Sequence, residues 1–251
     1  MLRALYLAYF WLVFIPALVM LTLVLGVIAL TLAPLLGPRA AGRLTGVPWS
    51  RFGLAATGVN VRIVGKEHID PRQSYVIVAN HLSHYDIWVL YGYLGIDIRW
   101  VAKKELRSLP VVGIACVALG HVFIDRSDHK QAIESLQQAR KQIVRGTSII
   151  FFPEGTRSRT GALKPFKKGA FRMARDLELP VLPVTLDGTY QVLRPGSPWV
   201  HPGEVVVTIH PPIPASGDGD EAIAELEQKS RAAIASTLAE SGSSHQEPAS
   251  P

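Results

Sequence analysis

The stretch Tyr75-Val76-Ile77-Val78-Ala79-Asn80-His81-Leu82-Ser83-His84-Tyr85-Asp86 joins a short apolar run to the start of a helix. Tyr75–Ala79 is predicted to be a buried strand, because it is short, apolar and rich in β-branched residues. Ser83 is a favourable N-cap residue, and Asp86 three residues later completes a capping box. A helix over His84–Tyr93 is therefore expected. A strand that leads into a helix through a short turn is a building unit of α/β proteins.

The alternation of strands and helices continues along the chain. From Val59 onward, short β-branched runs are separated by stretches of helical length, which predicts an α/β sandwich. The expected strands are Val59–Val64, Tyr75–Ala79, Ile98–Val101, His121–Ile124, Ser148–Phe152, Val181–Leu186 and Val205–Ile209. The expected helices are His84–Tyr93, Pro110–Ala118, Asp128–Arg145, Lys168–Leu177 and Asp220–Ala239.

The N-terminal region is apolar over a length that suits a membrane. Ala4 to Pro38 contains no charged residue, and this run exceeds the roughly 20 residues that one helix needs to cross a bilayer. Two prolines, Pro16 and Pro34, interrupt it. The sequence leaves two structures open: a single tilted membrane helix, or a re-entrant helical hairpin whose ends lie on the same side. Residues 39–58 are then expected to form a basic interfacial helix.

These patterns divide the chain into three parts. Residues 1–58 form a membrane-anchoring helical segment, residues 59–240 the α/β domain, and residues 241–251 a Ser- and Pro-rich tail that is expected to be disordered. The length of 251 residues suits one catalytic domain with a short extra segment.

The excess positive charge lies at the N-terminal end. The net charge is +6, and the residues before Glu67 include six basic side chains and no acidic one, whereas the rest of the chain holds 20 basic and 20 acidic residues. Basic residues beside an apolar segment are typical of proteins that bind an anionic membrane surface. Nucleic acid is not expected as a partner.

Several kinds of catalytic site are disfavoured by the sequence. Because Cys116 is the only cysteine, the chain forms no internal disulfide and no thiolate zinc site, and its apolar surroundings predict an inert buried thiol. The sequence contains no G-x-x-x-x-G-K-[ST] loop and no G-x-S-x-G nucleophile turn. A P-loop enzyme and an α/β-hydrolase are therefore not expected.

His81 and Asp86 allow more than one interpretation. Asp86 sits at the positive end of a helix, which keeps it ionised, and it would serve there as a capping residue alone. If the turn folds the imidazole of His81 over the first helical turn, the carboxylate orients the ring and leaves its other nitrogen as a general base. His84 adds a third interpretation, a metal site with His81 and Asp86, although no second His/Asp cluster supplies further ligands.

Two other strand ends carry residues that suit phosphate binding. Phe123–Arg126 and Phe152–Ser158 each end a predicted strand, where ligands of open α/β sheets bind. Arginine suits bidentate phosphate contacts, and Gly155 and Thr156 can present backbone amides to a phosphate or an oxyanion. An isolated basic loop is more often simply exposed to solvent. The two segments therefore indicate a phosphate-binding site only when they are considered together.

Taken in order, four motifs resemble those of the glycerolipid acyltransferases. They are Asn80-His81-x-x-x-x-Asp86, Phe123-Ile124-Asp125-Arg126, Phe152-Pro153-Glu154-Gly155-Thr156-Arg157-Ser158 and Val181-Leu182-Pro183-Val184. The resemblance extends over roughly Tyr75–Pro212, and Val101–Leu106 matches a further basic segment of the family. It implies a mixed sheet flanked by helices. The most similar member type is the bacterial 1-acyl-sn-glycerol-3-phosphate acyltransferase.

The resemblance also implies a role for each motif residue. His81 would be the general base and Asp86 its orienting partner, while Pro183 would shape the acyl channel. The residues expected at the phosphate of the acceptor are Arg126 and Arg157, with Lys103 or Lys104. The residues expected at its glycerol backbone are Glu154, Gly155 and Thr156.

The reaction that the resemblance implies is an acyl transfer. A fatty acyl chain moves from acyl-CoA or acyl carrier protein to the sn-2 hydroxyl of lysophosphatidate, a membrane lipid, and phosphatidic acid forms. No metal and no cofactor is expected besides the acyl donor as co-substrate. The catalytic face is expected on the cytoplasmic side of the cell inner membrane. Another lysophospholipid, glycerol-3-phosphate or a lyso-aminolipid remains an alternative acceptor, and a non-catalytic lipid-binding protein remains an alternative class.

Overall fold

A seven-stranded mixed sheet forms the centre of the molecule. The computed structural model describes residues 2–125, 135, 137, 139–140, 143 and 146–244. The strands are β1 (Val59–Val64), β2 (Val76–Ala79), β3 (Asp97–Lys103), β4 (Val122–Ile124), β5 (Thr147–Phe151), β6 (Val181–Asp187) and β7 (Gly203–Ile209). Their order is β1-β7-β6-β2-β5-β3-β4, and every neighbouring pair is parallel except β6 and β7. The predicted mixed α/β fold is therefore confirmed.

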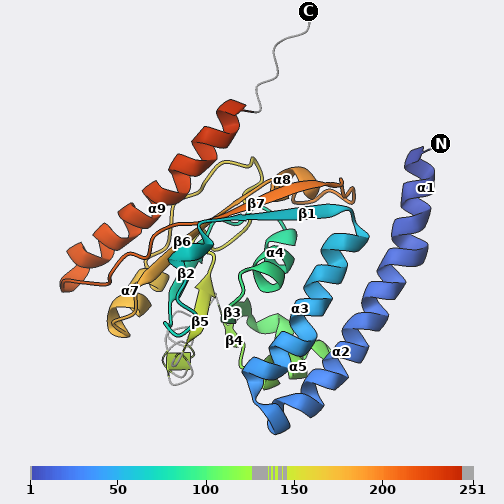
Figure 1. Cartoon of the computed structure of the whole chain (residues 1–251), viewed down its shortest axis with the longest axis horizontal. Helices are drawn as coiled ribbons and strands as arrows, with labels where there is room; N and C mark the ends of the chain where they lie inside the picture. The colour runs from blue at the N-terminus through green and yellow to red at the C-terminus, as the bar shows by residue number, and fades with distance from the viewer. Residues whose placement is uncertain are drawn as a thin grey trace, which may run out of the picture.

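Helices cover both faces of the sheet (Figure 1). On one face lie α7 (Gly169–Asp176) and α9 (Gly219–Ser244), which contact β2 and β6 and each other. On the other face lies α4 (Tyr85–Tyr93), and α3 (Pro38–Ala56) packs on it from outside. The shorter helices are α5 (Val112–Ala118) and α8 (Thr189–Val192).

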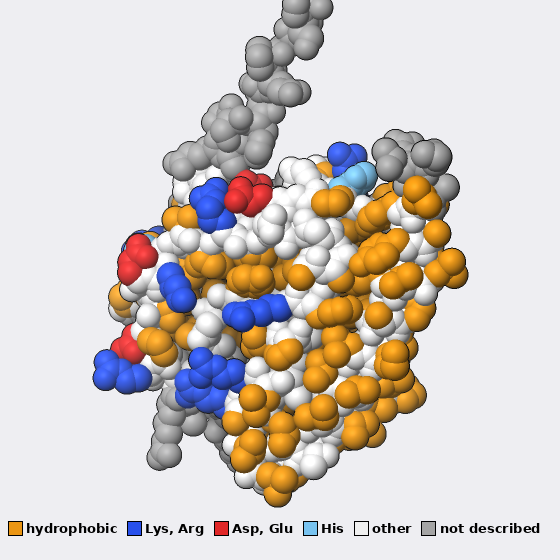
Figure 2. Space-filling model, turned by 45° about the vertical axis from the view of Figure 1, so that its right-hand side comes forward, with side chains coloured by type: hydrophobic (Ala, Val, Ile, Leu, Met, Phe, Trp, Pro, Cys, Tyr) orange, Lys and Arg blue, Asp and Glu red, His pale blue; other side chains and the backbone are white. Residues whose placement is uncertain are grey.

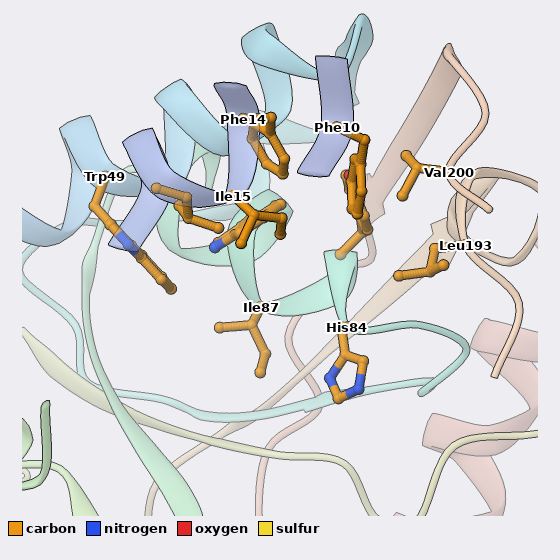
Figure 3. A pocket seen from close by; sticks show the side chains of 11 residues that line it. Phe10, Phe14, Ile15, Trp49, His84, Ile87, Leu193 and Val200 are labelled. Atoms are coloured by element: carbon orange, nitrogen blue, oxygen red, sulfur yellow. The ribbon is translucent and has the colours of Figure 1, made fainter. Parts of the chain in front are cut away.

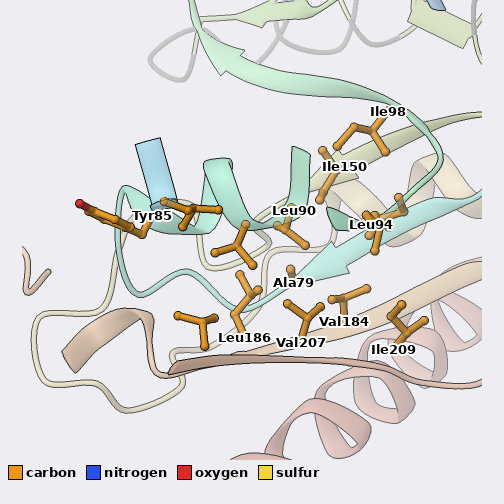
Figure 4. Packing of buried hydrophobic residues seen from close by; sticks show 14 of the residues in the cluster. Ala79, Tyr85, Leu90, Leu94, Ile98, Ile150, Val184, Leu186, Val207 and Ile209 are labelled. Atoms are coloured by element: carbon orange, nitrogen blue, oxygen red, sulfur yellow. The ribbon is translucent and has the colours of Figure 1, made fainter. Parts of the chain in front are cut away.

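The alternation of side chains along β2 builds two cores at once. Val76 and Val78 pack in the cluster beneath α7 and α9, whereas Ile77 and Ala79 pack in the cluster beneath α4. Figure 4 shows the α4 side of this packing, where Ala79 lies close to Leu90. A strand buried on both faces is apolar throughout, which explains why β2 shows no polar alternation.

The N-terminal helix runs without a break through the apolar segment. Helix α1 (Leu2–Tyr9), a π-helical turn (Phe10–Phe14) and α2 (Ile15–Leu36) follow one another directly. The chain reverses only at Gly37, where φ is +84°, and α3 then runs back along α2. The helical hairpin is therefore made of α2 and α3, and not of two arms within Ala4–Pro38. Within the described residues, one helix is long and apolar enough to cross a membrane, Leu5–Leu36.

Helix α3 packs against its neighbours on one side and exposes basic residues on the other, so the interfacial position expected for residues 39–58 stays a prediction. Helix α3 buries a stripe of small residues, and its neighbour α4 fills the space they leave. A Cβ at Gly46 would lie only 1.8 Å from Cε1 of Tyr91, and one at Gly53 2.8 Å from the ring of Trp88. Trp49 donates a hydrogen bond to the Thr22 hydroxyl at 2.8 Å, which ties α3 to α2. Helix α3 is thus a packed layer between α2 and α4, because its glycines permit close approach.

The ends of several elements differ from the predictions. All seven strands form, each within two residues of its expected bounds. Helix α9 continues to Ser244, past the expected start of the tail at residue 241, and residues 245–251 lie outside the described part. Much of the helix predicted at Asp128–Arg145 also lies outside it. Helix α8 and the 3-10 turns at Lys66–His68 and Lys104–Ser108 were not predicted, because short turns carry no clear periodicity.

Candidate active site

Residues from three of the four predicted motifs meet at one edge of the sheet, whereas the fourth, Val181–Val184, lies inside β6. Strands β6, β2, β5, β3 and β4 are parallel, so their carboxyl ends lie on the same side. His81 follows β2, Glu154 follows β5, Lys103 ends β3, and Asp125 follows β4. This edge is where open α/β sheets bind their ligands.

The carboxylate of Asp86 is the most heavily bonded group at this edge. Its Oδ2 lies 2.8 Å from Nδ1 of His81 and accepts the main-chain N–H groups of Leu82 at 2.7 Å and Ser83 at 2.9 Å. Asp86 is fully buried at the start of α4. The capping contact and the histidine contact therefore exist together, on the same oxygen. The side chain of His81 is 16% exposed, and within the described residues its Nε2 makes no hydrogen bond to the protein.

The loop after β5 surrounds the main chain of His81. Glu154 accepts the His81 N–H at 2.7 Å through Oε1 and the Lys164 N–H at 3.0 Å through Oε2. Burial raises the pKa of the Glu154 carboxyl, while these two N–H groups act in the opposite direction. Ser158 donates its own N–H to the His81 carbonyl at 2.8 Å.

The imidazole ring of His81 is part of a stack of aromatic rings. The rings of His81 and Phe152 are parallel within 9°, with centroids 3.9 Å apart. Trp100 of β3 stacks on Phe152 at 5.9 Å. The sequence placed Phe152 and Ser158 in a motif at this strand end but assigned them no role, and it gave no sign of Trp100, because an apolar ring or a serine carries little chemical signal by itself.

The basic residues of the site have unequal surroundings. Arg157 is partly buried, and its charge, after the larger effect of burial, lowers the pKa of His84 at the start of α4. Lys104 forms an ion pair with Asp125, whereas Lys103 is exposed at the end of β3. Arg126 lies outside the described residues. Arg157 is thus the predicted phosphate ligand that the structure brings into electrostatic reach of the His81 turn.

Gly155 does not offer its amide as expected. Its N–H donates to the carbonyl of Phe152 at 3.0 Å, so the amide closes a turn. Its φ is +76°, and a Cβ there would lie 3.0 Å from Cε of Lys167. The backbone conformation, with its positive φ, is what favours glycine at this position. Thr156 beside it is exposed. Lys167, one of the basic residues that follow the motif in the sequence, is a further cation at the loop.

An apolar cavity of about 270 Å³ opens beside α4. Figure 3 shows Phe10, Phe14 and Ile15 of the N-terminal helix on one wall, and His84, the N-cap of α4, with Ile87 of α4 on the other. Pro183, which was expected to shape an acyl channel, does not line this cavity. It is buried inside β6 opposite Val78.

The remaining candidates for chemistry are weaker. Burial raises the pKa of the Cys116 thiol to about 11, as expected for an inert cysteine. In the part of the chain that the structure describes, no three His, Cys, Asp or Glu residues are grouped as metal ligands would be. The fold and site define an α/β protein with a carboxylate–histidine pair at the carboxyl edge of its sheet, beside basic residues and an apolar cavity.

Known proteins share this combination. The family model described as acyltransferase matches residues 60–187, and the chain belongs to the acyltransferase family. It is 34% identical over 222 residues to the 1-acyl-sn-glycerol-3-phosphate acyltransferase of Pseudomonas aeruginosa, with 86% of this chain and 84% of that protein covered. The corresponding protein of Saccharomyces cerevisiae is 32% identical over 221 residues, with 86% and 73% covered. The chain spans 53% of the length of a Chlamydomonas reinhardtii relative that is 35% identical.

A solved structure has the same fold. The crystal structure of the 1-acyl-sn-glycerophosphate (LPA) acyltransferase PlsC from Thermotoga maritima matches with a TM-score of 0.69 and 28% sequence identity. The match covers 88% of this chain and 96% of that one.

Proposed function

We propose that the protein transfers a fatty acyl chain from acyl-CoA or acyl carrier protein to the sn-2 hydroxyl of lysophosphatidate. The contact between Asp86 Oδ2 and Nδ1 of His81 carries this proposal, because it leaves Nε2 as the nitrogen that can act as a base. The names of the relatives agree with this substrate. No cofactor is proposed besides the acyl donor.

The proposed mechanism is a direct transfer. Nε2 of His81 removes the proton from the sn-2 hydroxyl while the oxygen attacks the thioester carbonyl. A tetrahedral oxyanion forms and collapses as its carbon–sulfur bond breaks, and the leaving thiolate of the coenzyme or carrier takes up the proton held by His81. Asp86, at the start of α4, stabilises the imidazolium that exists between these two proton transfers.

The apolar cavity is proposed to hold an acyl chain. Its walls are hydrophobic, and its border includes His84, three residues after His81. Burying methylene groups there is favourable by about 0.8 kcal/mol for each CH₂. The cavity would therefore bind the chain while the head group stays with the basic residues at the edge of the sheet.

The assay that tests this function measures free thiol released from acyl-CoA by the purified protein. Lysophosphatidate, glycerol-3-phosphate, other lysophospholipids and a lyso-aminolipid are compared as acceptors. Fastest release with lysophosphatidate is expected. Faster release with another acceptor would assign the protein to that substrate, and no release with any of them would identify a lipid-binding protein without this activity.

Replacing Arg157 with alanine should mainly raise the KM for lysophosphatidate. A phosphate contact is made in both the ground state and the transition state, so its loss weakens binding more than turnover. Removing one charged hydrogen bond costs on the order of 1.5–3 kcal/mol, about a 10- to 150-fold change. Initial rates over a range of acceptor concentrations measure the effect. With an acceptor that lacks a phosphomonoester, the same variant should raise the KM much less. An equal rise in KM with both acceptors would show that Arg157 is a structural residue.

The apolar N-terminal helix is proposed to hold the protein at the cytoplasmic face of the inner membrane. Figure 2 shows a broad band of hydrophobic side chains on the face that includes this helix, with Lys and Arg gathered beside it. Leu12 is 75% exposed and Met20 64% exposed, although both are apolar. Such a surface suits a bilayer with anionic head groups better than water.

The double variant Leu12→Glu, Met20→Glu should bind anionic vesicles about 10²- to 10⁴-fold more weakly, because two apolar contacts of about 1.5–3 kcal/mol each are replaced by charges. Co-sedimentation with vesicles measures this. The matched control is Gln228→Glu, Ala232→Glu on exposed positions of α9, which adds the same charge. Equal loss in both variants would show a general charge effect and would remove the helix as the anchor.

A further inference from the structure

We infer that the loop Phe152–Ser158 positions the catalytic base, and that Glu154 acts on the reaction through His81 and not by contact with the acceptor. The inference rests on the function proposed above, in which His81 is the general base. It replaces the contact with the glycerol backbone that the resemblance implied for Glu154.

Contacts from this loop hold His81 on three sides. Glu154 accepts its main-chain N–H at 2.7 Å, and Ser158 donates to its main-chain carbonyl at 2.8 Å. Phe152 lies flat against its ring with centroids 3.9 Å apart. The contact of Asp86 with Nδ1 then fixes the rotation of the imidazole ring of His81. The position of the imidazole is therefore set jointly by two turns that follow neighbouring parallel strands, β2 and β5.

The surroundings of Glu154 indicate that its carboxylate links two main-chain segments and does not bind the acceptor. Its second oxygen accepts the Lys164 N–H at 3.0 Å, and the residue is only 3% exposed. Both oxygens are thus bonded to main-chain groups, and little of the carboxylate reaches solvent. The bond to Lys164 also closes the loop on itself, ten residues further along the chain.

The variant Glu154→Gln should lower kcat about 10- to 100-fold and leave the KM for lysophosphatidate within about threefold, since a displacement of about 1 Å at the reacting group can cost 10² in rate. Glutamine keeps the shape but brings one NH₂ group, which faces the N–H of His81 or of Lys164, so one of the two bonds is lost. The matched control Glu221→Gln removes one negative charge from an exposed position on α9 and should keep normal kinetics.

A second measurement separates this inference from the proposed function. Nitrogen-15 NMR of the histidine rings is recorded without substrate, and the His81 signals are assigned by their loss in His81→Ala. These signals should shift in Glu154→Gln and stay unchanged in Glu221→Gln. If the wild type transferred no acyl chain to lysophosphatidate, the proposed function would fail, whereas the NMR comparison would still decide the positioning.

Two outcomes would overturn the inference. A raised KM with kcat within twofold would make Glu154 a ligand of the acceptor, and unshifted His81 signals would show that Glu154 does not position the ring. If Glu154→Gln did not fold, Phe152→Leu would replace it, because it removes the stacked ring and keeps the main-chain bonds. The same kcat loss at constant KM is expected there, and a raised KM at constant kcat would again overturn the inference.

Discussion

Replacing His81 with alanine should lower turnover by about 10²–10⁴-fold, the usual loss when a general base is removed. The main-chain N–H and carbonyl that bond to Glu154 and Ser158 remain in this variant, so the turn and the loop should keep their positions. The loss is therefore expected in kcat and not in folding. Initial rates of thiol release from acyl-CoA with lysophosphatidate measure it.

His201 offers a matched control for this variant. It is an exposed histidine whose main-chain N–H donates to the carbonyl of Val192 at 2.8 Å. His201→Ala should show normal turnover and an unchanged melting temperature. A folded His81→Ala protein with near-normal turnover would rule out His81 as the base and with it the proposed mechanism.

Replacing Asp86 with asparagine should have the second large effect, a loss of turnover on the order of 10²–10⁴-fold. The corresponding Asp to Asn change in a serine hydrolase triad costs about 10⁴ in kcat, because the amide favours the wrong tautomer and cannot stabilise the imidazolium. Here the amide oxygen can still accept the N–H groups of Leu82 and Ser83, so the start of α4 should be retained. Rates and thermal unfolding are measured on the same preparation.

The two roles of Asp86 predict different results. If it serves only as a helix cap, Asp86→Asn should lower the melting temperature and leave kcat nearly normal. If it orients His81, kcat should fall far more than the change in stability explains. Because Asp86 is fully buried, Asp86→Ala should be worse for folding than Asp86→Asn, since it leaves two main-chain N–H groups without a partner.

Much of the architecture was predictable because it depends on local patterns. The run Val76–Ala79 is apolar on both faces, and only a strand between two helical layers buries such a segment. Helix α4 begins where Ser83 and Asp86 mark a helix start, although its N-cap is His84, one residue later than expected. The helix ends were less predictable, because α9 loses its periodic pattern before it ends at Ser244.

One contact at the site is local, because the N–H of Gly155 closes a turn on the carbonyl of Phe152 three residues earlier. Pro183 is buried inside β6 opposite Val78, and its expected role in shaping an acyl channel stays a prediction. The stack of Phe152 on His81 depends instead on how the strand order brings distant segments together, since it joins residues 71 positions apart in the chain.

By itself, the sequence determined the α/β alternation, the apolar N-terminal helix and the chemical types at the strand ends, because each depends on neighbouring residues and their periodicity. Only the tertiary structure decided what these groups contact. Parallel pairing of β2 with β5 brings the loop of Glu154 against the main chain of His81, and the glycine at position 46 lets α3 pack closely against Tyr91 of α4. Hydrogen-bond partners and burial arise from contacts between distant segments, so no local pattern contains them.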